Sequence, residues 1–196
     1  MKEAGRNETG RAIAAWWRVL HPNEEGRRGD RATAARLRRA ATPNEVIVVP
    51  EAIRLHGIVC KALERERLSE RESESVAVLA GVLAVVKPAA RTNYTSFAAM
   101  LGKTADGRPP RADERPLFSP TRFASLIRTE DAEERLRHLR RAVAVSRGAS
   151  FDVARFADDI LRWNDVTRRR WIFEYYQQGR AAPETDSPDS EEDTAQ

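Results

Sequence analysis

The chain has 196 residues, 41% of them hydrophobic and 33% charged, which is enough to bury one substantial core or two small helical ones. It has no apolar run close to the roughly 20 residues that a membrane-spanning helix needs, and its N-terminal residues lack the apolar stretch of a signal peptide. Its single cysteine, Cys60, excludes an internal disulfide framework. These features argue against transport and secretion, and they lead us to expect a cytoplasmic protein without membrane contact.

Charge is distributed unevenly along the chain. There are 34 Lys and Arg residues against 30 Asp and Glu residues, which gives a formal net charge of +4. Six of the acids lie in residues 183–196, which contain no base, so residues 1–182 carry 34 bases against 24 acids. Thirty of the bases are arginine. Arginine suits phosphate recognition, but a GC-rich coding sequence produces the same bias without a function, and composition alone leaves both explanations open.

The first half of the chain has helical periodicity with one short exception. A first helix is expected at about residues 9–20, and a second from Asp30, as N-cap, to about residue 41, where Pro43 stops it. Residues 45–49 are rich in β-branched side chains but have no partner strand. We expect them to form extended chain that leads into a helix with Pro50 at its first position.

A long apolar helix is expected in the middle of the chain. Ser69 and Glu72 have the spacing of a capping box, which begins a helix that runs to about residue 86. Residues 76–86 are apolar on all sides, so this helix should be central and buried. A brief helix at 96–101 follows it.

Residues 103–118 combine three prolines and a glycine with many charges, and we expect them to be a linker. Four helices are predicted after it, with Ser119 and Pro120 as the start of the first. The expected ranges of the first three are 119–128, 129–146 and 150–163, and the fourth is formed by the stretch that begins at Arg162 and runs to about residue 178. The predicted fold is therefore all-α, with an N-terminal lobe at 1–102, a C-terminal bundle at 119–180 and a disordered acidic tail at 181–196.

Helical projection separates arginines with structural roles from arginines that are free to bind a partner. In the helix at 150–163, arginines and aspartates three and four residues apart should neutralise one another on a solvated face. The helices at 30–41 and 133–147 instead carry basic faces without acidic neighbours, and two further arginines precede the first of them. These free arginines are Arg27, Arg28, Arg31, Arg38 and Arg39 in the first half, and Arg137, Arg140 and Arg141 in the second. Two such faces favour contact with the phosphates of a nucleic acid, although a merely solvated basic surface remains an alternative.

Residues 162–176 interleave arginines with aromatic rings, a pattern that occurs in nucleic-acid grooves and in helix cores alike. On one helix, Arg168 to Arg170 span about 200° and cannot form one patch. We expect Trp171, Ile172 and Tyr175 to form one apolar strip. Val166 and Phe173 should form another on nearly the opposite side. The segment is therefore predicted to be a helix wedged between neighbours and mainly structural.

The sequence contains no recognisable catalytic arrangement and no glycine-rich phosphate or dinucleotide loop. His56 and Cys60 are four residues apart on one helical face, but further metal ligands are missing nearby. We therefore expect no enzyme activity, no cofactor and no metal. Stoichiometric zinc in protein purified without added metal would contradict this expectation.

Six short motifs, in their order, resemble one known family. From about residue 13 to residue 176 the chain contains "WWRVL", "GDRATAARLRRA", "EVIVVPEAIRL", "SPTRFASLIR", "LRHLRRAV" and "WNDVTRRRWIFEYY". Each motif is weak alone, but together they are similar to the CasB family, the small subunit of the type I-E CRISPR surveillance complex Cascade. The acidic tail and the proline-rich linker depart from this resemblance.

The resemblance implies an all-helical, non-enzymatic protein that is present as two copies in a complex with a guide RNA and the other Cascade subunits. Its basic surfaces would help to hold the target and displaced DNA strands without reading their sequence, because guide pairing supplies the sequence. It points to Arg31, Arg38, Arg39, Arg137, Arg140 and Arg141, and it adds Arg122. The alternative function that we retain is a helical transcription regulator that reads duplex DNA.

Overall fold

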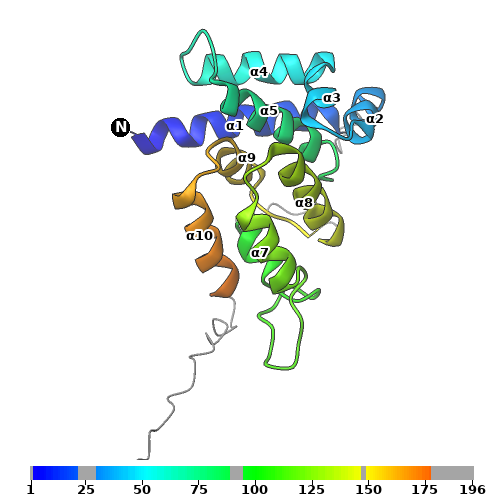
Figure 1. The fold of residues 1–196 in the computed structure, drawn as a ribbon, viewed down its shortest axis with the longest axis vertical. Helices are drawn as coiled ribbons and strands as arrows, with labels where there is room; N and C mark the ends of the chain where they lie inside the picture. Colours follow the sequence, from blue (N-terminus) through cyan, green and yellow to red (C-terminus); the bar gives the residue numbers. More distant parts are fainter. Residues whose placement is uncertain (1, 22–29, 89–94, 147–148, 178–196) are drawn as a thin grey trace, which may run out of the picture.

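The computed structural model describes residues 2–21, 30–88, 95–146 and 149–177, with side chains from residue 8 onward (Figure 1). All secondary-structure elements in these ranges are helices, so the all-α class is confirmed. The helices are α1 (Lys2–Leu20), α2 (Arg31–Arg39), α3 (Pro43–Ile47), α4 (Pro50–Ala62), α5 (Glu70–Leu83), α6 (Phe97–Leu101), α7 (Pro120–Arg128), α8 (Ala132–Val145), α9 (Val153–Leu161) and α10 (Asp165–Tyr176). The tail expected to be disordered lies outside the described residues, which end at Gln177.

Helix α5 lies at the centre of the fold. It contacts α2, α3, α4, α8 and α9, and its residues from Ser75 to Leu83 are all buried. A capping box of Ser69 and Glu72 begins the helix, as the sequence predicts. A helix that is apolar on every side needs neighbours on every side, and α5 has them.

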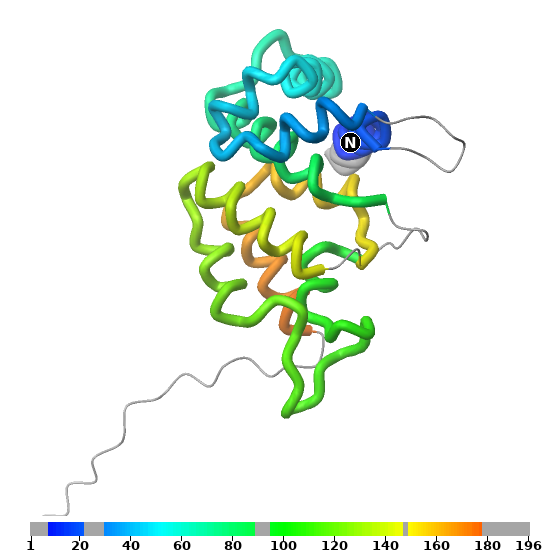
Figure 2. Tube along the Cα trace, turned by 90° about the vertical axis from the view of Figure 1, so that its right-hand side faces the viewer, coloured from blue at the N-terminus to red at the C-terminus, as the bar shows by residue number. Residues whose placement is uncertain are grey.

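Helices from both halves of the sequence pack against each other (Figure 2). Helix α9 lies against α1 and α5, and the short helix α6 lies against α10. The buried residues form one continuous hydrophobic core. Helices from the two expected lobes, at 1–102 and 119–180, therefore pack against each other and share this core.

Two glycines allow helices to approach closely. A β-carbon on Gly10 would collide with the backbone carbonyl of Ala154, and one on Gly102 would collide with that of Tyr175. These contacts join α1 to α9, and the end of α6 to α10. The close packing between the two halves of the chain therefore depends on small residues at these positions.

Gly102→Ala is expected to lower the free energy of unfolding by about 2 kcal/mol, because the opposing carbonyl is backbone and cannot rotate away. Gly57→Ala is the control, since nothing lies within 4 Å of a β-carbon added there. In the interior of a helix that substitution should stabilise by about 0.5 to 1 kcal/mol. Urea unfolding, monitored by circular dichroism, measures the free energy of unfolding of both variants. Equal stability of the two variants would contradict the close contact.

The segment 103–118, expected to be a linker, is a folded loop. The N–H of Leu117 donates to the carbonyl of Lys103 at 2.7 Å, and the N–H of Phe118 donates to that of Leu101 at 3.2 Å. Phe118 is 0% exposed, and its carbonyl accepts the hydroxyl of Tyr175. Two apolar residues at the end of the segment therefore anchor a stretch whose prolines and charges otherwise suggest a linker.

Residues 45–49 are not the extended chain that the sequence predicts, because helix α3 includes the first three of them. Thr42 is the N-cap, and its hydroxyl accepts the N–H of Glu45 at 3.2 Å. Helix α2 already ends at Arg39, and Pro43, expected to stop it, is in the first turn of α3, where its missing N–H costs nothing. The N-cap residue and proline together outweigh the β-branched composition.

The polar face of α9 packs against α10 and is not the solvated face that the sequence predicts. Arg162, the C-cap residue of α9, does pair with Asp158, as expected. Asp159, however, is 5% exposed and accepts hydrogen bonds from Trp171 and Arg170. Arg155 pairs with Glu174 of α10. These pairs join two helices and are structural.

One side of α10 is buried and the other is not. Trp171 and Tyr175 are in the core, as predicted, but Val166 and Phe173 are 64% and 63% exposed. The prediction that α10 is wedged between neighbours is therefore wrong for its second apolar strip. Two of the three consecutive arginines have structural partners: Arg168 pairs with Glu130 at 2.6 Å, and Arg170 pairs with Asp159.

Candidate nucleic-acid interface

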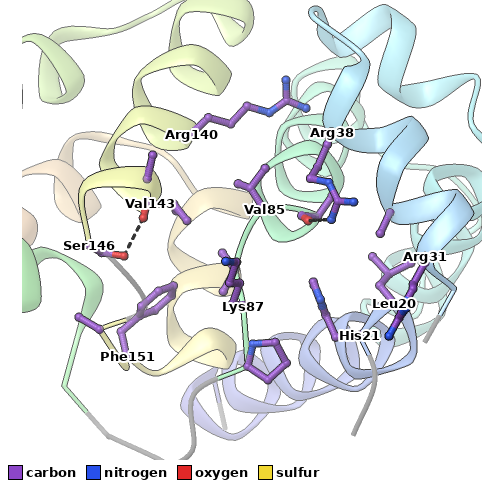
Figure 3. A pocket seen from close by; sticks show the side chains of 16 residues that line it. Leu20, His21, Arg31, Arg38, Val85, Lys87, Arg140, Val143, Ser146 and Phe151 are labelled. Carbon is purple, nitrogen blue, oxygen red and sulfur yellow. Dashed lines mark hydrogen bonds between the residues drawn. The ribbon is translucent and has the colours of Figure 1, made fainter. Parts of the chain in front are cut away.

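A groove separates α2 from α8, and the end of α5 forms its floor (Figure 3). Its volume is about 980 Å³. Its basic lining residues come from three places in the sequence: Arg31 and Arg38 from α2, Lys87 from the segment after α5, and Arg140 from α8. No Asp or Glu of the described residues lines the groove. Apolar side chains, among them Leu20, Val85, Val143 and Phe151, complete its walls.

Helix α2 forms one wall because of its N-cap and its apolar seam. The carboxylate of Asp30 accepts the N–H of Thr33 at 2.9 Å, which fixes the start of the helix. Leu37 is buried toward α5, so Arg31 and Arg38 project into the groove. The guanidinium of Arg38 donates to the carbonyl of Ala84 at 3.4 Å and remains exposed. Both α2 arginines are thus available to an anion.

Arg140, predicted to be a free cation, is instead a structural link between helices. It is half-buried, and its guanidinium donates to the carbonyls of Leu37 at 2.7 Å, Ala40 at 2.6 Å and Gly81 at 3.1 Å. Leu37 and Ala40 are at the end of α2, where carbonyls lack helical partners and a cation is favourable. Burial lowers the pKa of Arg140 from its ordinary value. The residue lines the groove, but its donors already bind backbone oxygens.

The other predicted site residues lie around the groove or away from it. Arg137 and Arg141 are exposed on the outer side of α8, where Arg137 pairs with Glu134 at 3.4 Å. Arg39 is exposed on α2 and donates to the carbonyl of Ala35, and Arg122 is exposed on α7. None of these four lines the groove. Arg27 and Arg28 lie outside the described residues.

Two groove residues were not predicted from the sequence. Lys87 directly follows the predicted helix that ends at about residue 86, and it is exposed on the floor of the groove. His21 also lines the groove, where its Nε2 lies 3.2 Å from the carbonyl of Leu83. Burial lowers the pKa of His21, so the groove owes its charge to arginine and lysine. The position of Lys87 one residue before Pro88, at a helix end, is the only local signal for it.

The described residues offer no metal centre. Cys60 Sγ lies 3.7 Å from His56 Nδ1, and His56 Nε2 lies 3.1 Å from the hydroxyl of Ser73. No group of three or more His, Cys, Asp or Glu side chains with suitable geometry occurs in the part of the chain that the structure describes. Among the described helices, none is both long and apolar enough to cross a membrane.

Comparison with known proteins gives a consistent result. The family model for CRISPR-associated protein Cse2 matches residues 33–176. The crystal structure of CasB from Thermus thermophilus covers 86% of this chain and 97% of its own, with a TM-score of 0.58 and 24% identity. That of a CRISPR-associated protein of the Cse2 family, also from Thermus thermophilus, covers the same shares, with a TM-score of 0.59 and 25% identity. A search of curated proteins gave no match. The chain therefore belongs to the CRISPR-associated Cse2 family, which also includes CasB, and it is a CRISPR Cascade subunit.

Proposed function

We propose that this protein is a non-catalytic small subunit of a type I-E Cascade complex that binds nucleic-acid backbones without reading their sequence. In that role it stabilises the guide RNA, the target DNA strand and the displaced strand of the R-loop in antiviral defence. Its partners are the other Cascade subunits and a second copy of itself, and it acts in the cytoplasm.

The observation that carries this proposal is the groove between α2 and α8. Arg31, Arg38 and Lys87 line it, no carboxylate of the described residues does, and these three cations have no ion pair with an acid in that part of the chain. Like charges gathered in this way repel one another, and a polyanion relieves the repulsion while releasing its own counterions. Phosphate contacts of this kind carry no sequence information.

The proposed contacts consist of a primary set inside the groove and further residues around it. Arg31, Arg38 and Lys87 lie within the groove and form the primary contacts. Arg137 and Arg141, on the outer side of α8, extend the basic surface beyond the groove. Arg39 and Arg122 are peripheral contacts, and Arg27 and Arg28 precede the α2 wall in the sequence. Arg140 contributes its positive charge, while its hydrogen bonds belong to the fold.

Arg31→Glu combined with Arg38→Glu is expected to weaken binding of single-stranded DNA and RNA by roughly tenfold or more at 0.1 M salt. It should also reduce the slope of log K against log salt by about 1.4, because each lost phosphate contact removes about 0.7 from the slope for a single strand. Fluorescence anisotropy with labelled oligonucleotides of several unrelated sequences, titrated over a range of NaCl concentrations, measures both quantities.

The matched control is Arg54→Glu with Arg67→Glu. It changes the net charge by the same amount, and both residues are exposed outside the groove. This control should bind close to the level of the unmodified protein. If both double variants lose affinity equally, the groove is not the binding surface. Binding restricted to one duplex sequence would instead favour a transcription regulator.

A further inference from the structure

We infer that the acidic segment 184–193 of this chain occupies the groove between α2 and α8 when no nucleic acid is bound, and that nucleic acid must displace it. The docking of the segment is independent of the proposed function, but its effect on nucleic acid rests on that function.

The first argument is charge complementarity. Residues 184–193 contain no base and six acids. The acids are Glu184, Asp186, Asp189, Glu191, Glu192 and Asp193. The groove has the opposite composition, with basic side chains and no carboxylate among the described residues of its lining. Helix α2 also has no acid between its first and last residues. A chain of carboxylates therefore offers these cations the kind of anionic partner that a row of phosphates offers.

The second argument is reach. The described structure ends at Gln177, and Asp193 is 16 residues farther along. Sixteen residues of extended chain span up to about 55 Å. A folded body of this size has a radius of gyration of about 16 Å, which corresponds to a diameter of about 40 Å. The acids from Asp189 to Asp193, which are 12 to 16 residues beyond Gln177, can therefore reach the groove from the end of α10 without any change in the fold.

The third argument concerns strength. A segment held by a short tether has an effective concentration of the order of millimolar near the groove. Weak ionic contacts with a dissociation constant of roughly 0.1 to 1 mM then occupy the groove for about half to nine-tenths of the time without blocking it permanently. Competition of this kind lowers the apparent affinity for nucleic acid by about two- to tenfold.

Salt dependence separates this competition from a simple reduction in net charge. When the acidic segment fills the groove, an incoming strand displaces carboxylates and releases fewer small counterions. The full chain should therefore show a shallower dependence of affinity on salt than a chain that lacks the segment. The two should converge at high salt, where the segment dissociates on its own.

The experiment compares three proteins: the full chain, a chain ending at residue 182, and a full-length variant whose six acids are replaced by the matching amides. We expect the second and third to bind a labelled single strand two- to tenfold more tightly at roughly 50 mM salt, with a steeper salt slope. In the Arg31→Glu, Arg38→Glu background, removal of the segment should change affinity by less than in the unmodified background, because the groove is no longer basic.

A synthetic peptide of residues 181–196, added to the chain ending at 182, locates the docking surface by NMR. Shifts are expected at Arg31, Arg38 and Lys87, and an amide-substituted peptide should cause none. Shifts confined to other surfaces, such as α7, would overturn the inference. Equal affinity of all three proteins for the strand would overturn it as well and leave the proposed function intact, whereas no binding by any of them would contradict the proposed function itself.

Discussion

Replacing Asp159 by Ala is expected to lower the free energy of unfolding by about 3 kcal/mol. Its carboxylate, on α9, accepts the indole N–H of Trp171 at 2.7 Å and pairs with Arg170, both on α10. Trp171 is completely buried, so alanine leaves its N–H without an acceptor, and Arg170 keeps only the longer pair with Glu174 at 3.7 Å. Thermal and urea unfolding of the two proteins at pH 7 measures the loss, which corresponds to roughly 10 °C in Tm.

Asp159→Asn is the matched control, because an amide oxygen still accepts the indole N–H. Burial is the main influence on Asp159 and raises its pKa above the ordinary 3.8, against the opposing effects of Trp171 and Arg170. A raised folded-state pKa means that the folded protein binds the proton more tightly, so this group's contribution to stability falls as pH rises from 3.8 through the folded-state pKa. Asparagine does not titrate, so its side chain makes no pH-dependent contribution to stability over this interval. The stability difference between Asp159→Asn and the unmodified protein should therefore shift in favour of the variant as pH rises over that interval. A pH-independent difference would contradict the raised pKa.

Local signals in the sequence predicted much of the fold. The N-cap at Asp30, the capping box at Ser69 and the start of α4 at Pro50 are all present as expected, because each depends on residues only a few positions apart. The burial of α5 also follows from sequence, since no face of it is polar enough to meet water. The sequence does not predict helix α3, because Pro43 is a stop signal for the preceding helix and also the first residue of the next one.

Features that depend on contacts between distant residues could not be predicted in this way. Arg155 and Glu174 are 19 residues apart, and Asp159 and Arg170 are 11 apart, so projection of single helices cannot pair them. Projection likewise places Val166 and Phe173 on an apolar strip without showing that no described element covers them. Periodicity identifies which residues share a face, but tertiary packing decides whether that face meets another helix.

The candidate site illustrates the same division. The sequence identified two basic helices in segments expected to form separate lobes. It did not predict that α2 and α8 form opposite walls of one groove, or that Lys87 lies on its floor. Helix α5 brings the two walls together, because it contacts both of them. The packing of both halves around one buried helix therefore brings Arg31 and Arg38 of α2, Lys87, and Arg140 of α8 to one groove, while Arg137 and Arg141 stay on the outer side of α8.

Arg140→Met is expected to lower the free energy of unfolding by about 3 kcal/mol, although the sequence alone presents Arg140 and Arg141 as equivalent exposed cations. Methionine keeps the apolar stem but removes the donors to Leu37, Ala40 and Gly81. The loss of these bonds should loosen the end of α2 from α5 and α8, and hydrogen exchange at the amides of α2 should accelerate along with the decrease in Tm.

Arg141→Met separates the two roles, because Arg141 is exposed and no hydrogen bond or ion pair of it is seen in the described residues. The free energy of unfolding of the Arg141→Met variant should differ from that of the unmodified protein by less than about 0.5 kcal/mol. The affinity of this variant for a single strand should fall modestly if the outer side of α8 extends the binding surface. A variant that reverses both charges would confuse the two effects, since lost binding would follow from lost folding. If Arg140→Met and Arg141→Met prove equally stable, the three carbonyl contacts do not hold α2 in place. Arg140 would then return to the set of cations available to a phosphate chain.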